Sequence, residues 1–134
     1  MKIAFLFAGQ YRPIPKDLIK YSIQNLTKGL DYSIFCYSWD EIGESLDHRE
    51  NIPKIKSDNN SYAHISSIFS QFNLKEICTE SYDDFVTNLP KNHKKIFNSN
   101  LYHSGTIFSL PQIYTLSKCY KLLDNDENEY DLIF

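Results

Sequence analysis

The residues best suited to bind a ligand follow the first apolar run of the chain. Gly9, Gln10 and Arg12 come directly after residues 3–8, which read Ile-Ala-Phe-Leu-Phe-Ala. Glycine allows close backbone approach, the glutamine amide donates and accepts hydrogen bonds, and the guanidinium grips phosphate or carboxylate with two parallel bonds. These residue types predict a cradle for the base and phosphates of a nucleotide. Arg12 is one of only two arginines, and pairing with a surface carboxylate is its alternative role.

A second group of chemistry-bearing residues ends the next β-rich run, at Trp39, Asp40 and Glu41. In an open parallel sheet, ligands collect beyond the carboxyl ends of the strands, so this group belongs beside Gln10 and Arg12. The indole of Trp39 can stack on a base or sugar, although a core aromatic is an equal interpretation. Asp40 and Glu41, with Glu44, can form a carboxylate pair or hold a divalent cation, but an ordinary solvated helix start explains them as well.

Several familiar motifs are missing from the sequence. The first apolar run is not followed by GxGxxG, and the chain contains no Walker lysine loop, no GxSxG and no HExxH. Nicotinamide dehydrogenase, P-loop kinase, serine hydrolase and zinc protease functions therefore lose support.

The elements that must position these residues begin with a strand, a helix and a strand. Residues 3–8 form an uninterrupted apolar run, which is typical of a strand buried on both faces of a parallel sheet. Two prolines follow in a loop, and a helix is predicted over 15–28, with Pro15 in its first turn and Gly29 at its end. A second strand over 32–39 completes a strand-helix-strand unit, which predicts an α/β layer fold.

The remaining chain predicts alternating helices and short strands. We expect a polar surface loop over 40–61 with a helical turn at 41–46, a helix carrying Ile65, Ile68, Phe69 and Phe72, a strand at 76–79, a helix at 82–89, a loop at 90–105, a helix at 109–124 and a strand at 130–134. The last helix should bury Ile113, Leu116, Tyr120 and Leu123, with Tyr114 also in the core. Ser109 and Gln112, in its first turn, are expected to face a ligand.

Composition bounds the function further. The 134 residues, 42% of them hydrophobic, suit one α/β domain, and a net charge of −3 without a basic stripe argues against nucleic-acid binding. The first apolar run is too short for a signal peptide or a membrane span, so we expect a cytoplasmic protein. Cys36, Cys78 and Cys119 are far apart and form no CxxC pair, which favours reduced buried thiols over a disulfide or zinc site.

Five segments in order resemble a known family. The opening KIAFLFAGQYR, the helix end QNLTKGL, the strand YSIFCYSW, the helix QIYTLSKCYKLL and the final YDLIF resemble bacterial and phage glycosyltransferase-like proteins of lipopolysaccharide and capsule clusters. The resemblance implies a GT-A-type domain, a Rossmann-like three-layer sandwich with a mainly parallel sheet. It also implies a nucleotide-sugar donor for sugar transfer in surface polysaccharide synthesis.

The resemblance assigns residues to the site. Gly9, Gln10 and Arg12 would line the nucleotide pocket, and Trp39 and Asp40 would border it. In the family, a divalent cation (Mn²⁺ or Mg²⁺) is held by an acidic residue in an arginine-rich segment that continues the strand matching 131–134. This sequence ends before that segment, so we expect residues 1–134 to be the amino-terminal portion of one larger domain, with no metal ligand and no turnover of its own.

Two other functions remain open at this point. The chain can be a non-catalytic α/β binding or assembly module, possibly phage-encoded, that uses an exposed sheet edge or the 40–61 loop to hold a partner. Exposed strand edges also favour homo-oligomers under either hypothesis. A weaker alternative is a small nucleotide-processing enzyme with a flavodoxin-like arrangement, for which the sequence offers no identifiable catalytic carboxylate.

Overall fold

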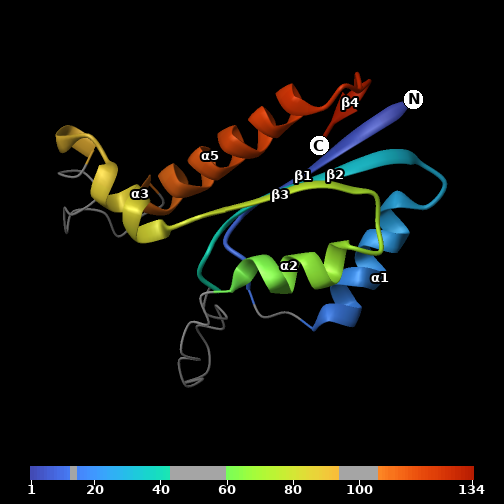
Figure 1. Ribbon diagram of the computed structural model, residues 1–134, viewed down its shortest axis with the longest axis horizontal. Helices are drawn as coiled ribbons and strands as arrows, with labels where there is room; N and C mark the ends of the chain where they lie inside the picture. The colour runs from blue at the N-terminus through green and yellow to red at the C-terminus, as the bar shows by residue number, and fades with distance from the viewer. Residues whose placement is uncertain (13–14, 43–59, 94–105) are drawn as a thin grey trace.

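Four parallel strands form the centre of the protein, with helices on both of their faces (Figure 1). The computed structural model describes residues 1–12, 15–42, 60–93 and 106–134. In chain order, the elements are β1 (Lys2–Gly9), α1 (Lys16–Thr27), β2 (Asp31–Trp39), α2 (Ser61–Phe69), β3 (Leu74–Glu80), α3 (Tyr82–Asn88), α5 (Thr106–Lys121), the short 3₁₀ helix η1 (Leu122–Asn125) and β4 (Leu132–Ile133). The predicted α/β class with a parallel sheet is confirmed.

The strands lie in the order β3-β2-β1-β4. β1 pairs along its whole length with β2, from Lys2 opposite Asp31 to Gly9 opposite Ser38. β1 also pairs in parallel with β4, where Ile3 lies opposite Leu132. The chain thus builds outward from β1 in one direction and then returns to add β4 on its other side.

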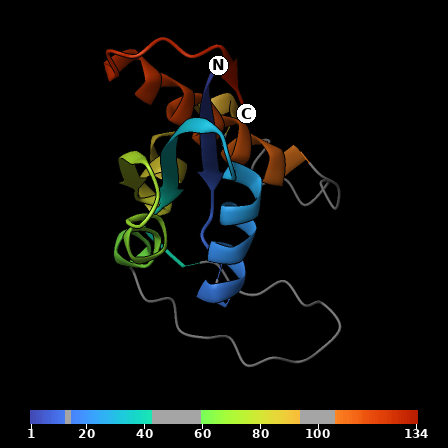
Figure 2. The same cartoon turned by 90° about the vertical axis from the view of Figure 1, so that its right-hand side faces the viewer.

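Alternating side chains of β1 and β2 supply two separate cores. Ile3 and Phe5 of β1 pack with Ile34 of β2 on the side of α1 and α2. Their sequence neighbours Ala4 and Phe35 point the other way and pack under α5 and η1. Because successive side chains of a strand point to opposite faces, a strand buried on both faces is apolar along most of its length. Figure 2 shows the resulting layers from the side.

The helix α1 agrees with its predicted limits, and its ends have clear causes. Pro15 directly precedes the first residue of α1. Gly29 lies two residues after its last residue, Thr27, and has a positive φ of 76°, a conformation that favours glycine at a helix end. In the sequence, Leu18, Ile19, Ile23 and Leu26 recur at helical spacing and predict one apolar face, and this prediction is only partly right. Ile23 is buried, whereas Leu18 and Leu26 are 56% and 53% exposed, because α1 packs on the sheet along a narrower stripe.

The buried face of α5 differs from the prediction. Ile113, Leu116 and Tyr120 are all more than half exposed, while Thr115 and Cys119 are fully buried. The helix approaches the sheet so closely that the Cys119 sulfur lies 3.5 Å from the carbonyl oxygen of Phe35. Small side chains at the contact permit this approach, so the larger apolar residues lie to the side or outside.

The last strand is shorter than predicted and lies at the edge of the described sheet. β4 contains only Leu132 and Ile133, both 41% exposed. Phe134 still bonds to β1: its N–H donates to the Ala4 carbonyl at 2.9 Å, and its carbonyl accepts from the Leu6 N–H at 2.6 Å.

Other expectations concern the helix boundaries and the loops. The second helix ends at Phe69, so Phe72 lies beyond it. The predicted helical turn at 41–46 and most of the loops at 40–61 and 90–105 fall outside the described residues. Pro111 lies inside α5, which begins at Thr106, three residues earlier than expected. Among the described helices, none combines the length and apolar character needed to cross a membrane.

The buried thiols lead to a first prediction. Cys36 and Cys119 are buried free cysteines, and Cys78 is partly buried. Burial raises the pKa of the Cys36 thiol, and it raises that of Cys119 to about 12. Since the thiolate is the reactive form, folded Cys78→Ser protein should show almost no reaction with dithionitrobenzoate at pH 7. Urea-unfolded Cys78→Ser protein should release two equivalents of thionitrobenzoate, one from each remaining cysteine. Rapid reaction of the folded variant would contradict the burial of Cys36 on the α1 and α2 face or of Cys119 under α5.

Candidate functional site

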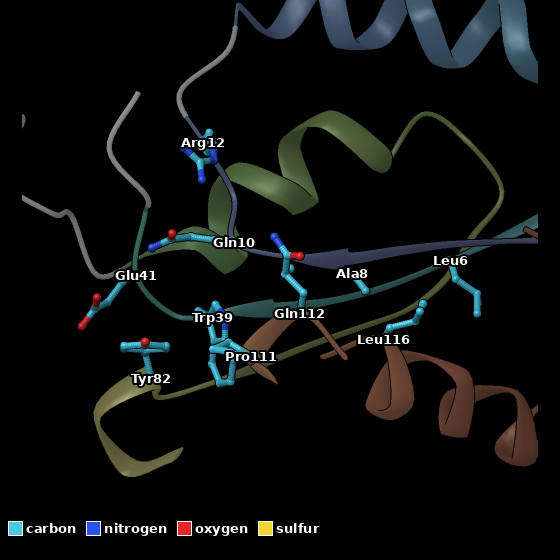
Figure 3. Close-up of a pocket in the computed structure, with 11 residues that line it drawn as sticks. Leu6, Ala8, Gln10, Arg12, Trp39, Glu41, Tyr82, Pro111, Gln112 and Leu116 are labelled. Atoms are coloured by element: carbon cyan, nitrogen blue, oxygen red, sulfur yellow. The ribbon is translucent and has the colours of Figure 1, made fainter. Parts of the chain in front are cut away.

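A cavity of about 600 Å³ lies where β1 and β2 end and the first half of α5 crosses them (Figure 3). It is bounded by the loop after β1, the end of β2, the start of α3 and one side of α5. Its described lining consists of Leu6, Ala8, Gly9, Gln10, Arg12, Trp39, Glu41, Tyr82, Pro111, Gln112 and Leu116. This is the carboxyl edge of a parallel sheet, where ligands of α/β proteins bind.

The loop after β1 carries the polar residues of this cavity. Gly9 has a φ of 124°, in the region that favours glycine, but an added Cβ would meet no atom within 4 Å. The glycine is therefore needed for the turn of the backbone. Its close approach to a ligand stays a prediction. The Tyr11 N–H then donates to the Ser38 hydroxyl of β2 at 3.3 Å, which holds the loop against the second strand.

Three predicted ligand contacts meet across the cavity. Gln10 and Arg12 line the cavity from the loop after β1, and Gln112 lines it from α5 (Figure 3). Two amides offer donors and acceptors, and one guanidinium offers paired donors for an anion. Gln112 lines the cavity as expected from its place near the start of the last helix. Ser109 lies in α5, and its side chain is outside the described residues.

Trp39 forms the apolar wall of the cavity and belongs to the core as well. The indole is only 3% exposed. It stacks on Tyr114 with centroids 5.9 Å apart and an interplanar angle of 7°, and it contacts Tyr82 edge-on at 5.2 Å. A ring so fully covered cannot offer a free face to a base. Trp39 therefore shapes the cavity, and its role there is apolar contact.

A half-buried carboxylate fixes α5 in place behind this wall. Glu80, the last residue of β3, accepts a hydrogen bond from the Tyr37 hydroxyl of β2. The Tyr114 hydroxyl of α5 lies 2.9 and 3.0 Å from the two Glu80 oxygens. One turn later, the Lys118 ammonium lies 5.3 Å from the Tyr114 ring centroid. The network joins two strands to the helix that carries Gln112.

Of the described residues that line the cavity, one is acidic, Glu41, and the charges of Asp83 and Asp40 act on its carboxyl. Burial, followed by these charges, raises the pKa of the Glu41 carboxyl. Asp40 does not line the cavity. Its N–H donates to the Glu80 carbonyl at 2.9 Å, and one of its carboxylate oxygens is buried without a hydrogen-bond partner among the described residues. The Glu41 carboxyl therefore keeps its proton to higher pH, and such a carboxyl is suited to acid or base catalysis.

The described part of the chain contains no group of three side chains placed to hold a metal ion. Asp40 and Glu41 are neighbours in sequence, but their third candidate partner, Glu44, is outside the described residues. The described residues alone therefore do not form a divalent cation site, and no chemical step is assigned to one.

Sequence reasoning missed some residues of this site and misplaced others. Glu80 ends β3 and Tyr82 lies two residues later. The predicted strand stopped at residue 79. A strand extended to residue 80 would have brought both residues under the rule that ligands collect at the carboxyl ends of strands, which selected Trp39. Leu116 was expected in the core and instead lines the cavity, half-exposed. The core assignment of Tyr120 is wrong, since its side chain is 53% exposed, whereas Tyr114 does pack in the aromatic cluster.

We found no match for this chain among protein-family models, curated proteins or solved structures. The function is therefore argued from the geometry of the site and from the residues that carry the resemblance.

The Glu80 network predicts alkaline sensitivity. Burial, and then the hydrogen bond to Glu80, raise the pKa of Tyr37. An unfolded tyrosine ionises near pH 10, so this contribution to stability is complete below about pH 10 and falls as the pH rises above it. Tyr37→Phe should flatten the decline of the unfolding free energy above pH 10 by up to ~1.4 kcal/mol per pH unit. Urea unfolding at several pH values measures this slope.

The matched control is Tyr21→Phe, because Tyr21 is 65% exposed on α1. It should retain the decline of the wild-type protein. Equal slopes for Tyr37→Phe and the wild type would show that the Tyr37 hydroxyl is not held by Glu80 in solution.

Proposed function

We propose that the chain binds a nucleotide-sugar donor in the 600 Å³ cavity, as part of a glycosyltransferase-like protein of surface polysaccharide synthesis. One observation carries the proposal: Gly9, Gln10 and Arg12, the residues that the resemblance assigns to the nucleotide, all line this cavity. Its volume lies within the range of small-molecule sites, about 300–1,000 Å³.

The topology supports the nucleotide part of the proposal. The strand order β3-β2-β1-β4 places the chain reversal between β1 and β4. Nucleotide-binding sheets of the doubly wound type use this order, and their ligands lie at the carboxyl end of the strands where the order reverses. A Rossmann-like, GT-A-type domain is the finer fold assignment that this arrangement favours.

Each part of a nucleoside diphosphate has a suitable group in the cavity. Arg12 supplies paired donors for a phosphate, while Gln10 and Gln112 offer amides to a base edge or a ribose hydroxyl. Leu6 provides apolar contact for the flat face of a base. Glu41, with its raised pKa, faces the same space and is the candidate to exchange a proton with a sugar hydroxyl.

A second function, assembly with another chain, is favoured by one observation. Ile113, Leu116 and Tyr120 form an exposed apolar stripe on α5, and Leu132 to Phe134 are exposed at the edge of the described sheet. Contiguous apolar surface of this kind is typical of interaction sites. A dimer in sedimentation whose interface covers Gln10 and Arg12 would favour an assembly module over nucleotide binding.

The proposal predicts nucleotide affinity that depends on Arg12. Titration calorimetry with UDP, GDP and their sugar conjugates, each with and without Mn²⁺, should reveal a ligand. Arg12→Ala should weaken that ligand about 10- to 150-fold, the equivalent of one or two hydrogen bonds to a charged group, and Gln10→Ala about 2- to 12-fold. Binding here does not require turnover.

The control is Lys28→Ala, which removes an exposed positive charge between α1 and β2, at the opposite edge of the sheet. Its affinity should equal that of the wild type. Failure of every nucleotide and nucleotide sugar to bind, or equal losses in Arg12→Ala and Lys28→Ala, would overturn the assignment of the site.

A further inference from the structure

The chain has a second cavity, on the other face of the sheet. Its volume is about 300 Å³, and it lies between the ends of β1 and β2 and the helices α1 and α2. Figure 1 shows these helices on the face opposite α5. The two cavities share one wall, since Ala8, Gly9, Gln10 and Arg12 line both.

The interior of this second cavity is apolar. Its lining includes Phe7 of β1, Cys36 of β2, Ile19 of α1, and Ile65, Ile68 and Phe69 of α2. None of these side chains offers a strong hydrogen bond. A nucleobase or sugar buried here would leave its polar edges unsatisfied, which carries a free-energy cost. The lining therefore selects a hydrocarbon.

The polar group deepest in the cavity is already engaged. The Ser38 hydroxyl accepts a hydrogen bond from the Tyr11 N–H at 3.3 Å and donates to the Trp39 carbonyl at 3.1 Å. The Tyr11 ring stacks on His64 of α2, with centroids 5.7 Å apart, which ties the loop to that helix. The remaining polar lining, Gln10 and Arg12, belongs to the shared loop at one end of the cavity.

We propose that this cavity binds a single-chain anionic amphiphile, such as a medium-chain fatty acid, with its hydrocarbon between α1 and α2 and its acidic head at the Arg12 loop. The charge supports an anion: Arg12 is the only basic residue among the described residues that line the cavity. The cavity volume of about 300 Å³ equals that of about ten water molecules. This is room for one short hydrocarbon chain. This inference concerns a second ligand and does not require the first cavity to hold a nucleotide.

Chain length provides the first test. Calorimetry with hexanoate, octanoate and decanoate should show an affinity gain of up to about fourfold per added methylene, the transfer free energy of a buried CH₂. The gain should stop once the chain fills the cavity. Affinity that does not depend on chain length would overturn the proposal.

The location is tested by placing a charge in the cavity. Ile19→Asp should weaken decanoate at least about tenfold, because the alkyl chain would then bury a carboxylate. Leu18→Asp is the matched control, since Leu18 is the next residue on α1 and is 56% exposed. Equal affinities in these two variants would overturn the site. If Ile19→Asp does not fold, Ile19→Trp, which fills the cavity, and Leu18→Trp form a second pair.

The charge of the head group provides an independent test. The wild type should bind decanoate more tightly than decanol, and Arg12→Ala should remove this difference while decanol affinity stays the same. An unchanged preference for decanoate in Arg12→Ala would show that the head lies elsewhere and would overturn the proposed orientation.

A nucleotide titration separates this proposal from the preceding one. Ile19→Asp should bind nucleotide as the wild type does, because Ile19 lines only the second cavity. Fatty-acid binding without nucleotide binding would remove the proposed function and leave this inference standing. Loss of nucleotide and decanoate together in a folded Ile19→Asp protein would contradict two separate sites.

Discussion

The parallel pairing of β1 with β2 is the constraint on which the rest of the structure depends. Eight residue pairs, from Lys2 and Asp31 to Gly9 and Ser38, bring the two strands to their carboxyl ends together. Both faces of this pair are mostly apolar, and each face is covered by its own layer of helices. The loop that follows β1 lies at the end of this strand pair and forms a wall of the cavities on both faces.

The position of α5 determines whether a cavity exists on its side of the sheet. Thr115 and Cys119 bring the later half of the helix against β1 and β2, and the Glu80 network holds Tyr114 nearby. Between these contacts and the Gly9 turn, the helix and the loop leave the space that Gln112 enters. A carboxylate outside the cavity therefore helps to determine its shape.

The sequence predicted the parts of the protein that local patterns determine. The apolar run of β1, the glycine after it and the helix after Pro15 are encoded within a few residues, and the strand-end rule then located Gln10 and Arg12. The buried face of α5 was not predictable in this way, because Ile113, Leu116 and Tyr120 have the same helical spacing as the residues that are buried. Only the close approach to the sheet selects Thr115 and Cys119. The contact between Tyr37 and Glu80 spans 43 residues and has no local signal.

The shared loop after β1 has a thermodynamic consequence for the two cavities. The same loop bounds both cavities, through Ala8, Gly9, Gln10 and Arg12, so a ligand that displaces this loop on one face of the sheet also changes the shape of the cavity on the other face. Linkage requires any such effect of one ligand on the affinity for the other to be equal in both directions, with this loop as the coupling element.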